Sequence, residues 1–477
     1  MPRKPASHGN TDETVIRMYR QGLGDCFLIT FQDETSDPVH MLIDCGVWDN
    51  DSETLARMKR VVEDIMTTTS GHLHLLVCTH EHWDHNSGFL QEQPVFDQMT
   101  IDNVWLAWTE DPSNSQAAKL KVEFEEKRRR LALATQQLHG VNPSLARTVE
   151  NLMHAADLGM RADPSGAMRW VRERSKTGSR IEYCTPGNVL PIPGGAAATA
   201  FVLGPPTLEK LLRKNLATKK ETEAGEVYEL ALANSFADNA FFAAAERSDK
   251  SAAGLGPLTM DQREEHALSM PFDAIHQIPA TSSGAIKLLA ESYDDFDQDW
   301  RRIDDDWMNT AAQIALWMDS STNNTSLSLA IELQPSKKVL LFVGDAQVGN
   351  WKSWQSLKFQ SPQDHLTMDD LLRRTVLYKV GHHGSHNATL RKEGLEKMTS
   401  EDLAAMIPVN RASVEKKKWK MPAAGMYQDL VRATQGRIIR ADEGLAPKPD
   451  NAPSNVYKAF QRRCRTTPLY IELRIPG

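Results

Sequence analysis

The feature that most constrains this chain is a cluster of metal-binding residue types placed directly after an apolar strand. The run LHLLVCT is predicted as a strand, ends at Thr79 and leads straight into HEHWDH. In extended backbone, alternate side chains share a face, so His80, His82 and Asp84 can converge. His85 enters from the start of the next turn, where the following NSG suits the beginning of a helix. A fold that carries this cluster must hold it at the end of a buried strand.

The residue types in this cluster favour a metal site. Neutral imidazole binds zinc and related metals, and a carboxylate adds a hard ligand that tolerates zinc, manganese or iron. A polar loop that happens to be rich in histidine is the alternative. Three histidines and an aspartate at H-x-H-x-D-H spacing argue against that alternative, because one chance histidine would not bring the other ligands with it.

The rest of the chain alternates strand and helix signals, which predicts an α/β fold. Before the cluster come VIRMY, CFLITF and HMLIDCG as strands and TLARMKRVVEDIM as a helix, a β-β-β-α-β opening. Strand signals return near residues 197–206 and again in the last third, in SLSLAIEL, VLLFVGD, TVLYKVGHHGS, AAMIPVN, GRIIRA and LYIELRI. Residues 1–14 are expected to form a flexible tail. Residues 15–477 are expected to form one domain, interrupted by mainly helical insertions at about 111–180 and 207–318.

Composition limits the classes of partner. Lys and Arg total 55 and Asp and Glu total 63, so the formal net charge is 55 − 63 = −8. An acidic balance argues against a large non-specific nucleic-acid surface, although bound divalent metals supply local positive charge in a nuclease. There is no run of about 18 apolar residues and no signal-peptide pattern, so no membrane association is expected. Five cysteines without a C-x-x-C pair suit a reducing cytoplasm.

Seven motifs in order resemble the metallo-β-lactamase superfamily, and most closely its ComEC-type branch. They are the H-x-H-x-D-H cluster, GLGDCFLI from Gly22, LIDCG from Leu42, NNTSL from Asn323, LFVGD from Leu341, KVGHHGS from Lys379 and GRIIRADEG from Gly436. The resemblance runs from about residue 15 to 477 and leaves the two insertions unmatched. It implies an αββα sandwich with a site for two divalent metals, zinc by expectation and manganese as the alternative.

Roles carried over from the resemblance form a specific set of expectations. His80 and His82 are expected to hold the first metal, Asp84 and His85 the second, and Asp345 to bridge both. His382 is expected to complete the second metal, because it follows its strand immediately. The resemblance implies that Asp25 and Asp44 hold the ligands or the loops in place, with a purely turn-forming role as the alternative. A buried carboxylate that accepts from a ligand imidazole fixes its tautomer.

Two positions depart from the pattern of the superfamily. Many members carry a further histidine for the first metal between the first motif and the bridging aspartate. The candidates are His139, His154, His266 and His276, none in a recognisable context. The branch often has His-Pro where this chain has Met421-Pro422. The first metal is therefore the less securely held of the two, and a site with one tight metal is the alternative.

Such a site is expected to perform metal-assisted hydrolysis, most consistent with a phosphodiesterase or nuclease. Asp84 and Asp345 would orient the attacking water, and His383 with Ser385 would contact the phosphate or protonate the leaving group. The expected partner is accordingly nucleic acid or another phosphodiester. A hydrolase of a small ester, lactone or nucleotide-derived molecule is the second interpretation. A catalytically silent scaffold is the third, and it would use the aromatic stripe around Trp300 and Trp307 to bind a protein partner.

Overall fold

The computed structural model describes most of the chain. Described are residues 13–32, 37–141, 164–214, 218, 221, 225–227, 321–359, 366–417, 419–450 and 452–477. Contacts divide the chain into two compact units, of which the first comprises Met1–Ala118, Asp163–Ala231 and Ser320–Gly477, and the second Lys119–Ala162 and Leu232–Asp319. All strands given below belong to the first unit. The aromatic stripe expected around Trp300 and Trp307 lies outside the described residues.

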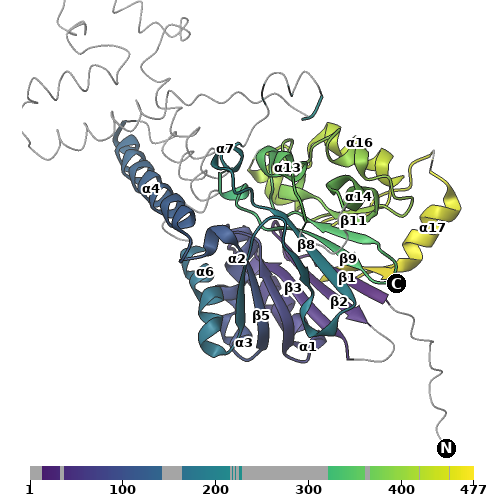
Figure 1. Cartoon of the computed structure of the whole chain (residues 1–477), viewed down its shortest axis with the longest axis horizontal. Coiled ribbons are helices and arrows are strands. Elements are labelled where there is room, and N and C mark those ends of the chain that lie inside the picture. Colours follow the sequence, from purple (N-terminus) through teal and green to yellow (C-terminus); the bar gives the residue numbers. More distant parts are fainter. Residues whose placement is uncertain are drawn as a thin grey trace, which may run out of the picture. The chain divides into compact units, whose positions relative to one another are not determined.

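The first unit is built on two mixed sheets of eight strands each (Figure 1). The first sheet has the order β15-β16-β1-β2-β3-β4-β5-β6, in which β3 to β6 run parallel. Its strands are β1 (Glu13–Tyr19), β2 (Cys26–Gln32), β3 (Val39–Cys45), β4 (His72–Cys78), β5 (Thr100–Ala107), β6 (Arg180–Cys184), β15 (Cys464–Thr466) and β16 (Tyr470–Pro476). Chain order therefore begins β-β-β-α-β, as the sequence predicts.

The second sheet has the order β14-β13-β12-β11-β10-β9-β8-β7, in which β10 to β13 run parallel. Its strands are β7 (Val189–Pro191), β8 (Ala198–Gly204), β9 (Ser328–Leu333), β10 (Val339–Phe342), β11 (Thr375–Lys379), β12 (Ala404–Ile407), β13 (Ile438–Arg440) and β14 (Gly444–Leu445). The antiparallel neighbours of both parallel blocks make the sheets mixed, and no described strand is shared between them.

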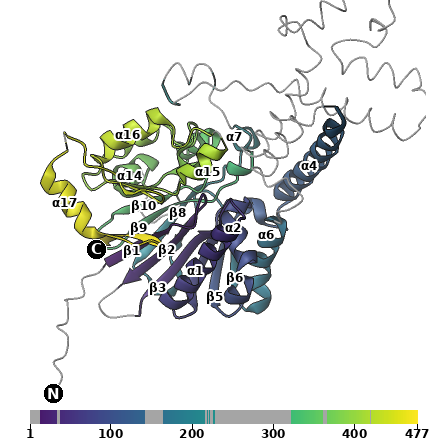
Figure 2. The ribbon, with the colours of Figure 1, turned by 180° about the vertical axis from the view of Figure 1, so that it is seen from behind.

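Helices cover the outer face of each sheet, as the two opposite views show (Figures 1 and 2). On the first sheet lie α1 (Ser52–Thr68), α2 (Trp83–Gln91), α3 (Gln93–Phe96) and α6 (Pro164–Glu173), whose apolar side chains share one core with that sheet. On the second sheet lie α13 (Val348–Trp354), α14 (Met368–Arg373), α15 (Arg411–Lys416) and α16 (Ala424–Thr434). The arrangement is consistent with the expected αββα sandwich.

The remaining described helices are α4 (Ser115–Val141), α7 (Glu209–Leu212) and α17 (Ser454–Arg463). Helix α17 contributes Tyr457 and Phe460 to the core between the sheets. No helix among the described residues is long and apolar enough to cross a membrane. Helix α6 belongs to the first unit, and its Trp170 stacks on Phe89 of α2 with ring centroids 5.5 Å apart. The insertion that the sequence predicts at about 111–180 therefore includes at least one helix of the sandwich itself.

Local sequence explains why α1 begins and which face it buries. The carboxylate of Asp51 accepts from the backbone N–H groups of Glu53 and Thr54, which satisfies two donors that a helix start leaves free. The buried residues of α1 recur at helical spacing: Met58, Val61, Val62 and Ile65. The helix, which connects β3 to the parallel strand β4, therefore packs its apolar face on the first sheet.

Candidate metal centre

The candidate centre lies where strands of both sheets end. Asp44 is the penultimate residue of β3, and the HEHWDH motif follows β4 and opens α2. Asp345 follows β10, and the paired histidines follow β11 in the short 3₁₀ turn Gly381–Gly384. Asp25 stands immediately before β2. Parallel strands place their carboxyl ends at one edge of a sheet, which is why residues distant in sequence meet here.

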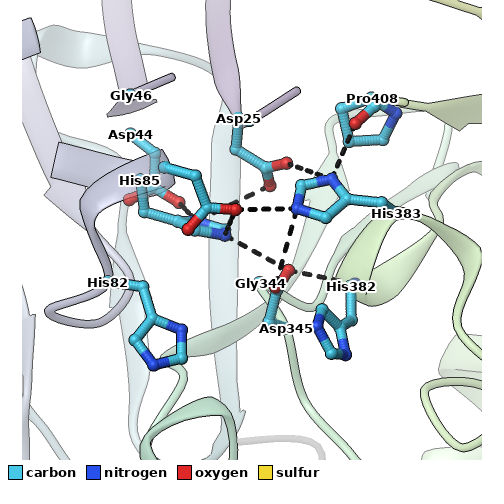
Figure 3. Close-up of polar contacts among 12 residues, drawn as sticks. Asp25, Asp44, Gly46, His82, His85, Gly344, Asp345, His382, His383 and Pro408 are labelled. Carbon is cyan, nitrogen blue, oxygen red and sulfur yellow. Dashed lines mark hydrogen bonds and ion pairs between the residues drawn. The ribbon is translucent and has the colours of Figure 1, made fainter. Parts of the chain in front are cut away.

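Four residues bring potential ligand atoms within 4.8 Å of one another, and all four are buried: Asp25, His85, Asp345 and His383. Asp84 adjoins them, since its Oδ2 lies 2.8 Å from Nε2 of His383 and 4.0 Å from Nε2 of His85. Figure 3 shows the carboxylates and the two rings pointing toward one another. Three of the six metal ligands expected from the sequence thus lie in or against one buried cluster from both sheets: Asp84, His85 and Asp345.

The tautomer of His85 is set from behind the ring. Its Nδ1 lies 2.8 Å from Oδ2 of Asp44, so Nδ1–H donates to that carboxylate. Asp44 also accepts from the backbone N–H and the hydroxyl of Thr79, each at 2.7 Å. Consequently Nε2 is the ring nitrogen of His85 that faces Oδ1 of Asp345, at 3.3 Å. A lone pair that faces carboxylates is repelled unless a proton or a metal ion lies between them.

His383 repeats this arrangement from the other sheet. Its Nδ1 donates to the carbonyl oxygen of Pro408 at 2.7 Å, and its Nε2 faces Asp84 at 2.8 Å and Asp345 at 4.0 Å. The backbone at His383 is left-handed, with φ +51°. Non-glycine residues rarely adopt this conformation outside functional or strongly constrained sites. The strained turn is what aims the ring of His383 at the centre.

The sequence-based expectation gives the ligand role to His382 and the substrate contact to His383. In the structure the ring of His383 belongs to the buried cluster and that of His382 does not. The Nδ1 of His382 lies 3.1 Å from Oγ of Ser385 and 3.4 Å from Nε2 of Gln347, to the side of the cluster (Figure 3). Only its backbone N–H reaches the centre, donating to Oδ1 of Asp345 at 3.0 Å. Ser385 also donates to Oδ1 of Asn387 at 2.9 Å.

His80 and His82 lie beside the cluster and form a pair of their own. Nε2 of His80 is 3.1 Å from Nδ1 of His82, and both rings are buried. Nδ1 of His80 lies 3.0 Å from the hydroxyl of Thr79 and 3.3 Å from that of Ser326. Neither ring belongs to the group of ligand atoms within 4.8 Å of one another. No side chain of the four candidate third ligands, His139, His154, His266 and His276, is described.

The buried charges of the cluster do not balance one another. Four carboxylates and one ammonium group are buried there: Asp25, Asp44, Asp84, Asp345 and Lys379. With neutral imidazoles, the formal charges of these groups sum to −4 + 1 = −3. Burial opposes ionisation of Asp345, but His85 and Lys379 hold its pKa well below the ordinary value. Burial likewise disfavours a protonated His85, yet the carboxylates, with Asp345 first, raise its pKa well above the ordinary value. The site therefore attracts positive charge.

These features fit a divalent cation. Nε2 of His85 has no hydrogen-bond partner among the described residues, although it is buried. Imidazole nitrogen and carboxylate oxygen are the donors that zinc and manganese accept, and a histidine ligand usually donates its other N–H to a carboxylate or carbonyl. Asp44 behind His85 and Pro408 behind His383 supply those partners. The buried cluster could therefore hold metal ions, and its donors do not by themselves select one metal.

Lys379 is the residue that sequence reasoning missed. It ends β11, is 1% exposed, and forms an ion pair with Asp25 inside the centre. Its Nζ also donates to the carbonyl oxygen of Gly344 at 2.8 Å and lies 3.4 Å from Oδ1 of Asp345. The available signal is a lysine at the end of TVLYK, an otherwise apolar strand, because a lysine is almost never fully buried without a partner.

Comparison with known proteins gives no match for this chain. The sequence matches no protein-family model and no curated protein.

Proposed function

We propose that this protein is a metal-dependent hydrolase, most consistent with a phosphodiesterase. One observation carries the proposal: two imidazole Nε2 atoms, of His85 and His383, face carboxylates in a buried cluster of four carboxylates and one ammonium group. Each imidazole is held from behind by an acceptor at Nδ1. The Nε2 atoms that carry protons toward the carboxylates in the metal-free protein can bind a cation instead once those protons are displaced.

The residues that would hold the metal are assigned by the direction of their ligand atoms. Asp84, His85, Asp345 and His383 would hold the better-provided position, because their ligand atoms point toward one another. His80 and His82 would supply a second and less complete position. Bound divalent ions lower the pKa of a water molecule and balance the negative charge that develops during displacement at phosphorus.

Other residues of the chain prepare the site for the reaction. Asp44 and the carbonyl of Pro408 keep the two ring orientations fixed, so that no reorganisation is needed during turnover. The near-complete burial of the ligands excludes bulk water and strengthens the electrostatic interactions inside. His382 and Ser385 lie beside the cluster without pointing into it, and these two side chains are proposed to contact the substrate.

The substrate class rests on the resemblance of the motifs to the ComEC-type branch. Phosphodiesters suit a site that can stabilise both the attacking and the leaving oxygen. A small carboxylic ester or lactone is the second candidate, favoured by the net charge of −8, which gives no general attraction for polyanions. Hydrolysis of either substrate class would use the same metal cluster. The residues around the cluster would decide which substrate binds.

The test is turnover of bis(p-nitrophenyl) phosphate by purified protein, with and without chelator, with zinc and manganese supplied separately. Metal-dependent release of nitrophenolate is expected. Matched assays with p-nitrophenyl acetate test the ester alternative in the same preparation. Protein that contains stoichiometric metal but hydrolyses neither substrate would contradict the proposal and favour a silent binding role.

A further inference from the structure

Asp25 faces the Nδ1 atoms of His85 and His383, whereas Asp84 and Asp345 face their Nε2 atoms. Its Oδ2 lies 3.8 Å from Nδ1 of His85, and its Oδ1 lies 3.9 Å from Nδ1 of His383 (Figure 3). Those are the two nitrogens already engaged by Asp44 and Pro408. Asp25 therefore lies behind both rings, whereas a metal would bind at the Nε2 atoms in front.

Asp84 and Asp345 face the front of the rings instead. Oδ2 of Asp84 is 2.8 Å from Nε2 of His383, and Oδ1 of Asp345 is 3.3 Å from Nε2 of His85. Distance alone groups Asp25 with the potential ligands, but direction separates it from them. The carboxylate of Asp25 thus requires a cation other than the metal. Lys379, the only ammonium group among the described residues of the centre, supplies it.

Lys379 links Asp25 to Asp345. Its Nζ is ion-paired with Oδ2 of Asp25 and lies 3.4 Å from Oδ1 of Asp345. It also donates to the carbonyl oxygen of Gly344, and the next backbone N–H, of Asp345, donates to Oγ of Ser326 at 3.0 Å. The peptide that carries Asp345 is therefore fixed on both sides.

We propose that Asp25 and Lys379 form a permanent ion pair that positions Asp345 for metal binding, and that Asp25 is not itself a metal ligand. Lys379 needs a partner because an unbalanced ammonium beside Asp345 would compete with the metal for that carboxylate. Asp25 provides this balance from behind the rings. The inference rests on the proposed function only in that the centre binds a metal, and it adds two positioning residues to the reaction.

Charge counting gives a test that separates a partner from a ligand. The wild-type cluster carries −4 + 1 = −3, Asp25→Asn carries −3 + 1 = −2, and Asp25→Asn with Lys379→Met carries −3 again. If Asp25 is the partner of Lys379, removing the lysine as well should recover metal binding. If Asp25 is a ligand, removing the lysine should change zinc affinity by the same factor with and without Asp25, and the single variant Lys379→Met supplies the comparison.

The experiment measures zinc affinity of the metal-free full-length protein by competition with a chromogenic chelator. Asp25→Asn is expected to bind zinc about 10–100-fold more weakly, the usual effect of removing a residue that orients a metal ligand. The double variant Asp25→Asn/Lys379→Met is expected to bind zinc more tightly than Asp25→Asn alone. Lys337→Met, which removes an exposed lysine paired with Glu332, is the matched control and should leave affinity unchanged.

The outcomes are distinguishable. The ion-pair assignment would be overturned, with the metal centre left intact, by a double variant as weak as Asp25→Asn or weaker. An equal effect of Lys379→Met in the wild-type and Asp25→Asn backgrounds would overturn it as well. Wild-type protein that binds no zinc or manganese would overturn the proposed function itself, and the ion-pair assignment with it. Should Asp25→Asn fail to fold, Asp25→Glu keeps the charge and the partner of Lys379. Near wild-type zinc affinity is then expected, and loss of binding would identify Asp25 as a ligand.

Discussion

At the scale of single residues, two adjacent histidines differ in role because of the backbone between them. Both lie in left-handed conformation, with φ +42° at His382 and +51° at His383, so the two rings diverge. His383→Gln is therefore expected to lose metal, whereas His382→Gln is expected to keep its metal and lose turnover. Metal content by mass spectrometry, measured beside hydrolysis rates, checks both. Retained metal in His383→Gln with loss in His382→Gln would restore the assignment expected from the sequence.

Asp345 provides the most direct test of the chemistry. Its side chain lies between the two Nε2 atoms, and its surroundings hold its pKa well below the ordinary value, so it is ionised and available to a cation. Asp345→Ala is expected to reduce kcat/KM by at least about 100-fold, since changes behind a ligand already cost 10–100-fold. Circular dichroism should show the fold retained. Full turnover by this variant would exclude the proposed centre.

The sequence indicates which residue types gather, but it does not indicate the direction in which they point. His85 and Asp345 could be placed because each follows a buried strand at a recognisable spacing. The choice between His382 and His383 depends on two left-handed backbone angles, which no local pattern in GHHGS specifies. The partnership of Asp25 with Lys379 spans 354 residues of chain between two sheets, so only the three-dimensional arrangement reveals it.

At the scale of elements, the junction between β3 and α2 fixes the centre with little tolerance. A Cβ placed on Gly46 would lie 2.3 Å from the backbone carbon of Asp84 and 2.4 Å from the backbone nitrogen of His85. Gly46→Ala is therefore expected to displace the start of α2 and reduce both zinc affinity and turnover by at least about tenfold. Phe460→Ala, which removes a fully buried side chain from the core between the sheets, is the control for general destabilisation. Equal effects of the two changes would indicate general destabilisation.

The strands were easier to predict than their division into two sheets. The apolar runs near β1, β2, β3 and β4 are short and bounded by turn residues, which gives a strong local signal. Strands β2 and β3 are buried on both faces, whereas β1 alternates between buried and half-buried residues. The division into two sheets carries no such signal, because it depends on pairings such as β1 with β16, at opposite ends of the described chain. Helix α2 also starts at Trp83, before the NSG sequence that indicated it, and its first cap residue, His82, makes no side-chain capping bond that a sequence pattern could reveal.

A buried histidine at the amino end of β3, outside the candidate centre, predicts that the folded state is less stable in acid. Burial first, and then the charges of His74 and His72, lower the pKa of His40 in β3 to about 4. The folded state therefore binds fewer protons than the unfolded state, in which histidine titrates near 6.5. Stability contributed by neutral His40 should be present above pH 6.5 and be lost as the pH falls toward 4. His40→Gln should weaken this pH dependence in urea unfolding of the metal-free protein; an unchanged dependence would contradict it.

At the scale of the whole molecule, charge bears on the size of the substrate. A nuclease that binds six to ten phosphates loses about 10³–10⁵ in affinity between 50 and 200 mM salt, because bound counterions are released. A chain of net charge −8 offers no general attraction for such a polymer, and among the described residues four carboxylates are buried together in the cluster. The proposed substrate is accordingly a small phosphodiester more readily than a long nucleic acid.

Salt dependence of turnover tests this preference in one protein preparation. We expect kcat/KM for a dinucleotide to change by less than about tenfold between 50 and 200 mM KCl, and long single-stranded DNA to be no better a substrate. Asp345→Ala, assayed in parallel, shows whether any nuclease activity belongs to this centre. A steep loss of DNA cleavage with salt, abolished by that variant, would show that a local basic surface overrides the net charge. Such a result would identify polymeric nucleic acid as the substrate, because only a multi-phosphate contact produces a steep slope.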